Sequence, residues 1–79
     1  MSREEILSIL KEIFTDAFDR DNLEISYDTT SSDIDGWDSH MHMNIIEMIE
    51  GEFQIQFDMD EIVGMENVGE MIDVIISHV

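Results

Sequence analysis

Apolar residues recur at helical spacing in the first part of the chain. They fall three or four residues apart, at Ile6, Leu10, Ile13, Phe14, Ala17 and Phe18. Ser2 and Glu5 precede them in the pattern of a capping box, in which the two side chains accept hydrogen bonds from backbone N–H groups at the helix start. The pattern predicts a first helix from about Arg3 to Phe18.

The next segment, from Asp19 to Trp37, breaks the helical pattern. Asp, Asn, Ser and Thr dominate it, and their short side chains compete for backbone hydrogen bonds and favour turns. Connections longer than about 12–15 residues are uncommon and tend to be functional or anchored by packing. Apolar residues available for anchoring are Leu23, Ile25, Tyr27, Ile34 and Trp37. We expect an ordered loop that lies across a helical bundle.

A second helix is predicted to begin after Asp38, which acts as its N-cap and leaves Ser39 at the first helical position. Its apolar stripe consists of Met43, Ile46, Ile49 and Phe53, with Ile45 beside it. Residues 54–57 alternate like a strand, but a lone short strand has no partner. We therefore interpret them as a linker.

Two more helices are predicted after this linker. A short one covers Asp58 to Val63 and ends at Gly64. Asn67 is the N-cap of the last, whose apolar residues are Val68, Met71, Ile72, Ile75, Ile76 and Val79. The predicted fold is all-α: a four-helix bundle of three longer helices and one short helix, with a long first loop. The length of 79 residues predicts one domain, residues 1–79.

Charge is the strongest compositional signal. Twenty Asp and Glu residues stand against three Lys and Arg, which gives a formal net charge of −17. This charge repels nucleic-acid phosphates and anionic lipids, so we expect neither nucleic-acid binding nor membrane insertion. The charge either steers the protein toward basic patches on partner proteins or serves solubility alone.

The absence of cysteine excludes a disulfide scaffold and a thiolate metal site. Charged residues interrupt the apolar positions of the N-terminal segment, so we expect no signal peptide and no membrane span. These features predict a cytoplasmic protein.

The acidic loop invites a test for calcium binding. If Gly36 occupies the sixth position of an EF-hand loop, Ser31, Asp33 and Asp35 take the first three ligand positions. The twelfth position, which requires a bidentate glutamate, is then His42. His40 and His42 are two residues apart and point to different faces of a helix. We expect no metal site, and a calcium buffer is the third-ranked function.

Ser39 is the remaining candidate for chemistry. His42 lies three residues further on the same helix, but no glycine-rich elbow surrounds the serine, so we expect no hydrolytic enzyme. A hydroxyl at a helix start is exposed, and a phosphodiester attached to it would be stabilised by the free N–H groups there. The alternative is that Ser39 merely caps the helix, since serine is common at helix starts, and local chemistry alone favours that alternative.

The surrounding residues resemble the second helix of acyl carrier proteins. The resemblance rests on the Asp38-Ser39 pair, the apolar stripe after it and the segment Glu50-Gly51-Glu52-Phe53. The start Gly36-Trp37-Asp38-Ser39, with His42 three residues after the serine, is similar to a tryptophan-bearing branch of that family. The resemblance covers the whole chain and is specific over roughly Gly36 to Ile76.

This resemblance implies a set of roles. Ser39 would carry 4'-phosphopantetheine, transferred from coenzyme A by a separate phosphopantetheinyl transferase, and Asp38 would cap the helix and be recognised by the transferase. His40, Met41 and His42 would lie beside the arm. Carboxylates of the second helix would dock on basic patches of acyl-transferring or acyl-processing enzymes: Glu47, Glu50 and Glu52. The protein would be a monomeric carrier of acyl thioesters for fatty-acid, polyketide or specialised lipid biosynthesis, and not an enzyme.

Two departures from the family pattern lead to a further hypothesis. His40 stands where the family has Leu or Met, and Met41 and Asn44 stand where it often has acids. We therefore expect a specialised set of partners. Methionine side chains repack easily, so those of this chain either give a deformable interior that admits an acyl chain or merely fill gaps in a small core. They are Met43, Met48, Met59, Met65 and Met71. The alternative function is an acidic protein-interaction module of the same fold without a prosthetic group.

Overall fold

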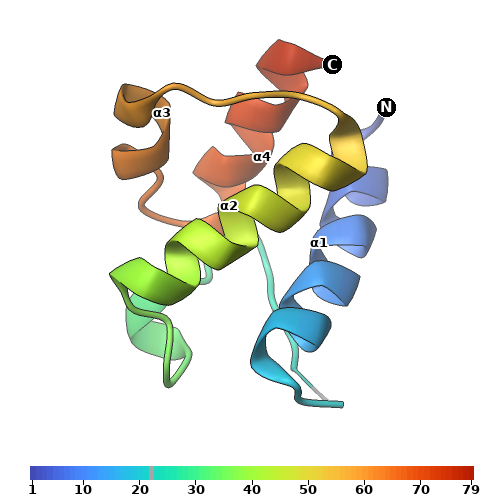
Figure 1. Ribbon diagram of the computed structural model, residues 1–79. Coiled ribbons are helices and arrows are strands. Elements are labelled where there is room, and N and C mark those ends of the chain that lie inside the picture. The colour runs from blue at the N-terminus through green and yellow to red at the C-terminus, as the bar shows by residue number, and fades with distance from the viewer. Residues whose placement is uncertain (22) are drawn as a thin grey trace.

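A computed structural model describes residues 1–21 and 23–79. In this part of the chain the elements are α1 (Arg3–Phe18), the 3₁₀ turn η1 (Ser31–Asp33), α2 (Ser39–Phe53), α3 (Met59–Val63) and α4 (Val68–His78) (Figure 1). An isolated antiparallel bridge joins Thr30 to Asn67. The predicted all-α bundle of three longer helices and one short helix is confirmed.

Side-chain caps begin α1, α2 and α4 where the sequence predicts them, and Asp58, predicted as the first residue of the short helix, is instead the N-cap of α3. The Ser2 hydroxyl and the Glu5 carboxylate form the capping box of α1. The N-caps of the other helices each accept a hydrogen bond from a backbone N–H three residues later; they are Asp38, Asp58 and Asn67. Because each cap satisfies a donor that the helix leaves without a partner, it fixes the first helical residue.

The core lies between α1, α2 and α4. Its fully buried side chains come from these three helices and include Ile6, Leu10, Phe14, Ile45, Ile46, Ile49, Val68, Met71, Ile72 and Ile75. Met43 is instead 38% exposed, so its predicted place in the apolar stripe of α2 is wrong. The buried face is centred on Ile45, Ile46 and Ile49, and Met43 lies at the edge of this face toward α3. The predicted stripe of α4 is likewise too wide, because Ile76 and Val79 are exposed beyond its buried face.

The methionines do not form a continuous interior. Met71 is fully buried and Met48 and Met65 are partly buried, whereas Met43 and Met59 are exposed. The prediction that Met43 and Met59 belong to a deformable core is therefore wrong. The reason is the position of α3, which packs beside the bundle and leaves both side chains at its junction with α2.

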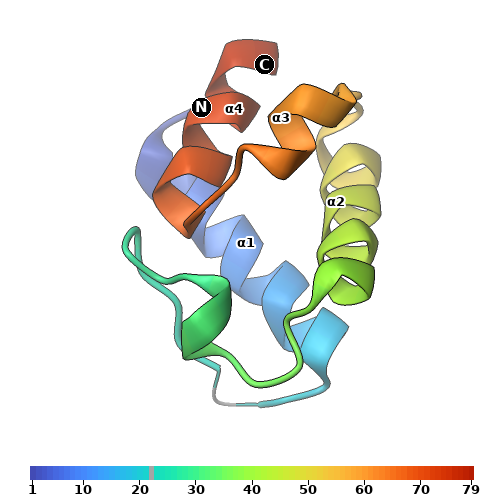
Figure 2. The same cartoon turned by 90° about the vertical axis from the view of Figure 1, so that its left-hand side faces the viewer.

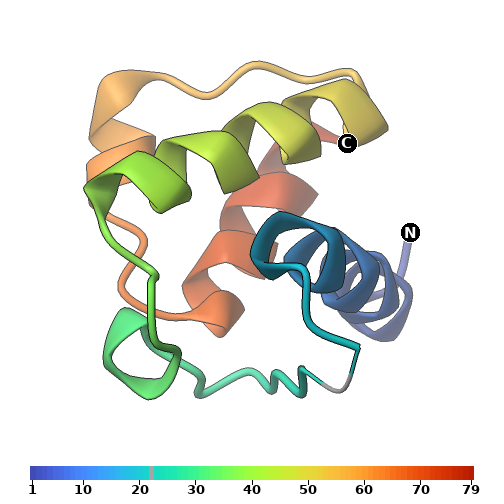
Figure 3. The same ribbon diagram turned by 60° about the horizontal axis from the view of Figure 1, so that its bottom comes forward.

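The described residues of the long connection between α1 and α2 lie across one end of the bundle, as Figures 2 and 3 show. Ile25, Ile34 and Trp37 are buried and anchor it. Tyr27, which the sequence predicts as a further anchor of the loop, is instead 36% exposed and lies under the guanidinium of Arg3. Asn22, which belongs to the predicted loop, lies outside the described residues.

Backbone hydrogen bonds tie this connection to the start of α4. The carbonyl of Tyr27 accepts from the N–H of Gly69 at 2.8 Å, and the carbonyl of Thr29 accepts from the N–H of Val68 at 2.9 Å. The two donors belong to the first turn of α4, where a helix has no partners of its own for its N–H groups. The connection therefore completes the hydrogen bonding of α4 as well as covering the core.

Both termini lie at the opposite end of the bundle from this connection (Figures 1 and 2). An ion pair between Arg3 and Asp73 links α1 to α4 there. Among the described residues no helix has the length and apolar character needed to cross a membrane.

Candidate functional site

A sharp turn presents Ser39 at the start of α2. Gly36 adopts a φ of +89°, which residues with a side chain rarely reach. The N–H of Asp38 then donates to the carbonyl of Gly36 at 3.0 Å. On the other side of the turn, the guanidinium of Arg20 donates to the carbonyl of Asp35 at 2.9 Å. The loop therefore enters α2 at a fixed angle, held by a bond to the end of α1.

Asp38 and Ser39 are both exposed at this helix start. The Asp38 carboxylate accepts from the N–H of Met41 at 2.8 Å, as expected of an N-cap. Ser39 is the first helical residue, so its hydroxyl lies beside the positive end of the α2 dipole. This arrangement suits a negatively charged group attached to the hydroxyl oxygen.

A pocket of about 470 Å³ opens beside Ser39. Three elements form its walls: the loop before α2, the first turns of α2, and α3 with the connection that follows it. Its lining is mainly apolar and comprises Ser31, Trp37, Asp38, Ser39, His42, Met43, Met59, Ile62, Val63, Met65 and Glu66. The exposed hydroxyl and an apolar cavity thus lie next to each other.

His42 crosses the pocket between two other elements. The indole Nε1–H of Trp37 donates to Nδ1 of His42 at 3.2 Å, and Nε2 of His42 lies 3.1 Å from the carbonyl oxygen of Ile62 in α3. Because Nδ1 accepts, the ring proton is on Nε2 and is donated to the carbonyl. Both ring nitrogens are therefore occupied by Trp37 and Ile62, which speaks against His42 as the base of a serine hydrolase.

The other predicted site residues lie outside the pocket. Among the described residues, the lining includes Asp38, Ser39 and His42 but neither His40, which is exposed, nor Met41, which is partly buried. Met59 and Val63 of α3 line the pocket, although sequence reasoning did not assign them to the site. Their signal in the sequence was the presence of three apolar residues, including Ile62, in a predicted helix too short to bury them all.

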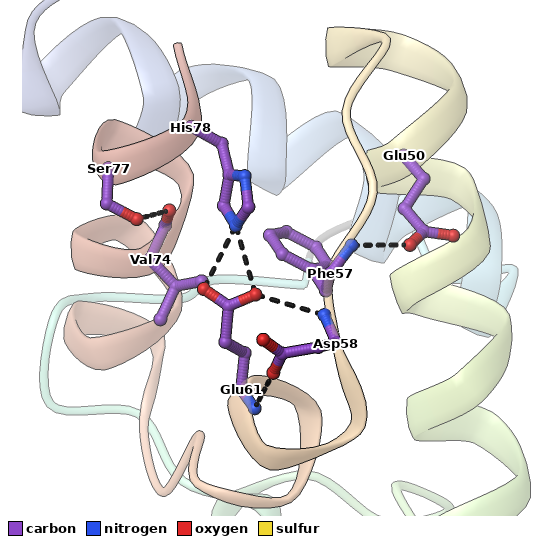
Figure 4. Close-up of polar contacts among 7 residues, drawn as sticks. All are labelled: Glu50, Phe57, Asp58, Glu61, Val74, Ser77 and His78. Atoms are coloured by element: carbon purple, nitrogen blue, oxygen red, sulfur yellow. Dashed lines mark hydrogen bonds and ion pairs between the residues drawn. The ribbon is translucent and has the colours of Figure 1, made fainter.

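The three candidate docking carboxylates differ in their surroundings. Glu47 and Glu52 are exposed on α2. Glu50 is partly buried, and its carboxylate accepts from the N–H of Phe57 at 2.9 Å, so it holds the linker between α2 and α3 (Figure 4). Glu47 and Glu52 are therefore the more available of the three for a partner.

Polar contacts of Glu61 connect α3 to the linker before it and to the end of α4, as Figure 4 shows. Glu61 accepts from the N–H of Asp58 at 3.0 Å and lies 2.9 Å from Nε2 of His78 at the end of α4. The hydrogen bond from the Asp58 N–H, followed by the one from His78, lowers the pKa of the Glu61 carboxyl below its ordinary value of 4.5. The ring of His78 also packs edge-on against Phe57 at 5.4 Å. The short helix is thus held toward α2 by His42 and toward α4 by His78.

Acidic residues are abundant, yet the part of the chain that the structure describes contains no cluster of three or more His, Asp or Glu side chains arranged to hold a metal ion. The polar loop around Gly36 instead makes hydrogen bonds within itself and accepts one from Arg20, which follows the end of α1.

Comparisons with known proteins place this fold and site in a class. The family model described as "Phosphopantetheine attachment site" matches residues 8–75, which is most of the chain. The chain therefore belongs to the phosphopantetheine-binding family of carrier proteins. A solution NMR structure of holo acyl carrier protein from Geobacter metallireducens is 37% identical, with a TM-score of 0.84, over 90% of this chain and 82% of that chain. No curated protein gave a significant match.

Membership in this family settles the general role. The protein is a carrier domain of the acyl carrier type and not an enzyme, and its prosthetic group is 4'-phosphopantetheine. Such carriers interact with phosphopantetheinyl transferases and with acyl-processing enzymes. The group, when bound, supplies a terminal thiol on which acyl groups are carried as thioesters, in keeping with a chain that has no cysteine.

Proposed function

We propose that this chain carries acyl intermediates on an arm attached to Oγ of Ser39. The observation that carries the proposal is the exposed Ser39 hydroxyl at the first residue of α2, directly beside an apolar pocket. In the attachment, catalysed by a separate transferase, Oγ bonds to the phosphorus of the pantetheine phosphate. The pyrophosphate bond of coenzyme A breaks, adenosine bisphosphate leaves, and the hydroxyl proton passes to the transferase.

The neighbouring residues suit this role in different ways. Asp38 caps α2 and lies next to the hydroxyl, where a transferase would recognise it. His40 is exposed beside the attachment point, and Met41 and His42 follow in the first turn. The residues around the pocket also fit the arm, because Met43 and Val63 offer an apolar wall to a chain that begins at Ser39.

We further propose that residues 1–79 act as one monomeric carrier domain in the cytoplasm. The net charge of −17 supports docking on basic patches of partner enzymes. Glu47 and Glu52, exposed on α2, would make the main contacts, and Glu50 would contribute less because it bonds to Phe57.

The cargo belongs to fatty-acid, polyketide or specialised lipid biosynthesis. We favour specialised partners, because His40 replaces the usual apolar residue after the serine and because the Gly36-Trp37-Asp38-Ser39 start fits the tryptophan-bearing branch. Efficient elongation of the acylated protein by a ketosynthase of general fatty-acid synthesis would contradict this preference.

The decisive test is intact-protein mass spectrometry after incubation with coenzyme A, magnesium and a promiscuous phosphopantetheinyl transferase. The parent protein is expected to gain one phosphopantetheine. The Ser39→Ala variant is expected to gain none, whereas Ser31→Ala, which alters another serine of the same pocket, should be modified like the parent.

Failure of the parent to be modified by several transferases would contradict the proposal. It would favour the alternative, an acidic interaction module of the same fold that binds basic partners without a prosthetic group. In that case Ser39→Ala should leave partner binding intact.

A further inference from the structure

His42 joins three separate segments around the pocket. It belongs to α2, accepts from Trp37 in the loop, and donates to the carbonyl of Ile62 in α3. This chain of two hydrogen bonds runs through one imidazole ring. Both outer members, Trp37 and Ile62, also line the pocket. The ring therefore sets the positions of two of its walls relative to the third.

The arrangement requires the neutral form of His42. Neutral imidazole has one acceptor nitrogen and one donor nitrogen, and here the acceptor is Nδ1, facing the indole N–H. A second proton on Nδ1 would place two N–H donors against each other. The bond to Trp37 would then break, while Nε2–H would continue to donate to the Ile62 carbonyl.

Trp37 belongs to the buried core, and its backbone N–H donates to the carbonyl of Ile34 at 3.3 Å. It is 9% exposed, stacks on His42 with 6.0 Å between ring centroids, and meets Phe14 of α1 edge-on at 5.1 Å. Its indole N–H can only donate, and its partner in this structure is Nδ1 of His42. Loss of that acceptor removes the polar contact that fixes the indole against the pocket.

The charged groups that face this ring are few. Asp38 at the N-cap of α2 and Glu66 after α3 line the same pocket. From α3, Glu61 is directed instead to Asp58 and His78, and from α1 the neighbour behind Trp37 is the apolar Phe14. Histidine is the side-chain type whose change of charge falls between about pH 5 and pH 8, which makes its hydrogen-bonding role sensitive to pH.

We propose that the Trp37–His42–Ile62 chain is a pH-sensitive lock on the pocket beside Ser39. His42 acts as a positioning residue. In its neutral form it holds the loop and α3 together across α2, and in its protonated form it releases the loop wall at Trp37. An acyl chain must widen the pocket to enter it, so we expect entry to be easier when His42 is protonated. This expectation for acyl chains rests on the proposed function, whereas the lock itself does not.

The lock is tested on the unmodified protein through the fluorescence of Trp37, the one tryptophan in the sequence. Emission followed from about pH 8 to about pH 5 is expected to show one transition. His42→Gln should abolish it, because the amide can still donate to the Ile62 carbonyl but does not titrate. The matched variant His40→Gln, two residues away and exposed, should retain it. A flat parent profile, a transition that persists in His42→Gln, or one that disappears in His40→Gln would overturn the lock.

A second measurement needs no variant. Nitrogen NMR of the His42 ring should show, at neutral pH, a bare Nδ1 and a protonated Nε2. As the ring gains its second proton, the indole N–H signal of Trp37 should shift in parallel. A proton on Nδ1 at neutral pH, or an indole signal indifferent to the titration, would overturn the proposal.

A separate experiment tests whether protonation of His42 eases the entry of an acyl chain into the pocket. The transferase is used to load acyl chains of increasing length, and the rise in Tm over the unacylated holo-protein is measured at about pH 5.5 and about pH 7.5, on either side of an ordinary histidine titration. The rise should be larger at the lower pH in the parent and equal at both in His42→Gln. Equal rises in the parent would overturn this consequence. Failure to load any chain would instead count against the proposed function, and the fluorescence result would still decide the lock.

Discussion

At the scale of single residues, a few side chains with special backbone or hydrogen-bonding roles present Ser39. Asp38 as N-cap and Ser39 as first helical residue could be read from the sequence, because a cap depends only on local chemistry. The partners of His42 could not. Ile62 is twenty residues away and meets His42 only after α3 has packed against α2. The left-handed residues at the ends of α1 and α2, Asp19 and Gln54, also went unpredicted, because neither is the glycine usual at such positions.

The conformation of Gly36 leads to a prediction at this scale. Its φ of +89° is costly for any residue with a side chain, so Gly36→Ala should destabilise the protein by about 1–2 kcal/mol. The cost is conformational, because an added Cβ would meet only the ring of Phe18 at an ordinary 3.9 Å. Urea unfolding measures the loss.

The matched control is Gly51→Ala, in a helical position with open space around the added Cβ. It should stabilise the protein by about 0.5–1 kcal/mol. Equal effects of the two substitutions would show that the turn before α2 does not need glycine.

At the scale of elements, α3 depends on its neighbours. A helix of five residues is not stable alone, because its few hydrogen bonds do not offset the conformational entropy lost when the first turn forms. It persists because Asp58 and Glu61 cap its start and because His42 and His78 hold its two sides. The sequence predicted its end at Gly64 and placed its start at Asp58, one residue before the observed start at Met59. The pocket that it forms with α2 was missed, because helical periodicity fixes which residues share a face and not the helix against which that face packs.

The lowered pKa of Glu61 predicts how this anchoring depends on pH. A carboxyl whose pKa is lower in the folded state stabilises the fold fully above its ordinary value of 4.5, and this contribution disappears as the pH falls through the folded pKa. The parent should therefore be more stable than Glu61→Gln at about pH 7, and the difference should vanish in acid. Urea unfolding of both proteins across this range measures it.

Glu47→Gln, a change at an exposed position of α2, serves as the control and should not be less stable than the parent at neutral pH. A gap between the parent and Glu61→Gln that stays constant down to acid pH would mean that the carboxylate charge does not hold α3.

At the scale of the whole molecule, negative charge is poorly compensated. Two of the three basic side chains are engaged within the fold: Arg3 pairs with Asp73 and lies over Tyr27, and Arg20 donates to the Asp35 carbonyl and lies over Phe18. The sequence predicted the net charge correctly because charge is a property of composition. It did not predict that the arginines would tie elements together, since those contacts join residues distant in the chain.

This imbalance predicts that salt stabilises the fold. Added sodium chloride screens repulsion between exposed carboxylates, over a Debye length of about 10 Å at 0.1 M, and should raise the Tm by several degrees. Calorimetry at increasing salt measures the effect. The double variant Glu47→Gln with Glu52→Gln, which removes two exposed charges from α2, should have a higher Tm at low salt and a weaker salt dependence. A Tm that falls or stays constant with salt would show that self-repulsion is not a significant cost.

The bonds between the loop and the start of α4 also bear on the order in which the protein acquires its structure during synthesis. The carbonyls of Tyr27 and Thr29 wait for N–H groups about forty residues further along the chain, and closing a loop of that length carries an entropic cost that is met only when the contact forms. A nascent chain can therefore form α1 and α2 before the carbonyls of Tyr27 and Thr29 have their hydrogen-bond partners in α4. The loop that leads to Ser39 can therefore make its two bonds to α4 only after Val68 and Gly69 have been synthesised.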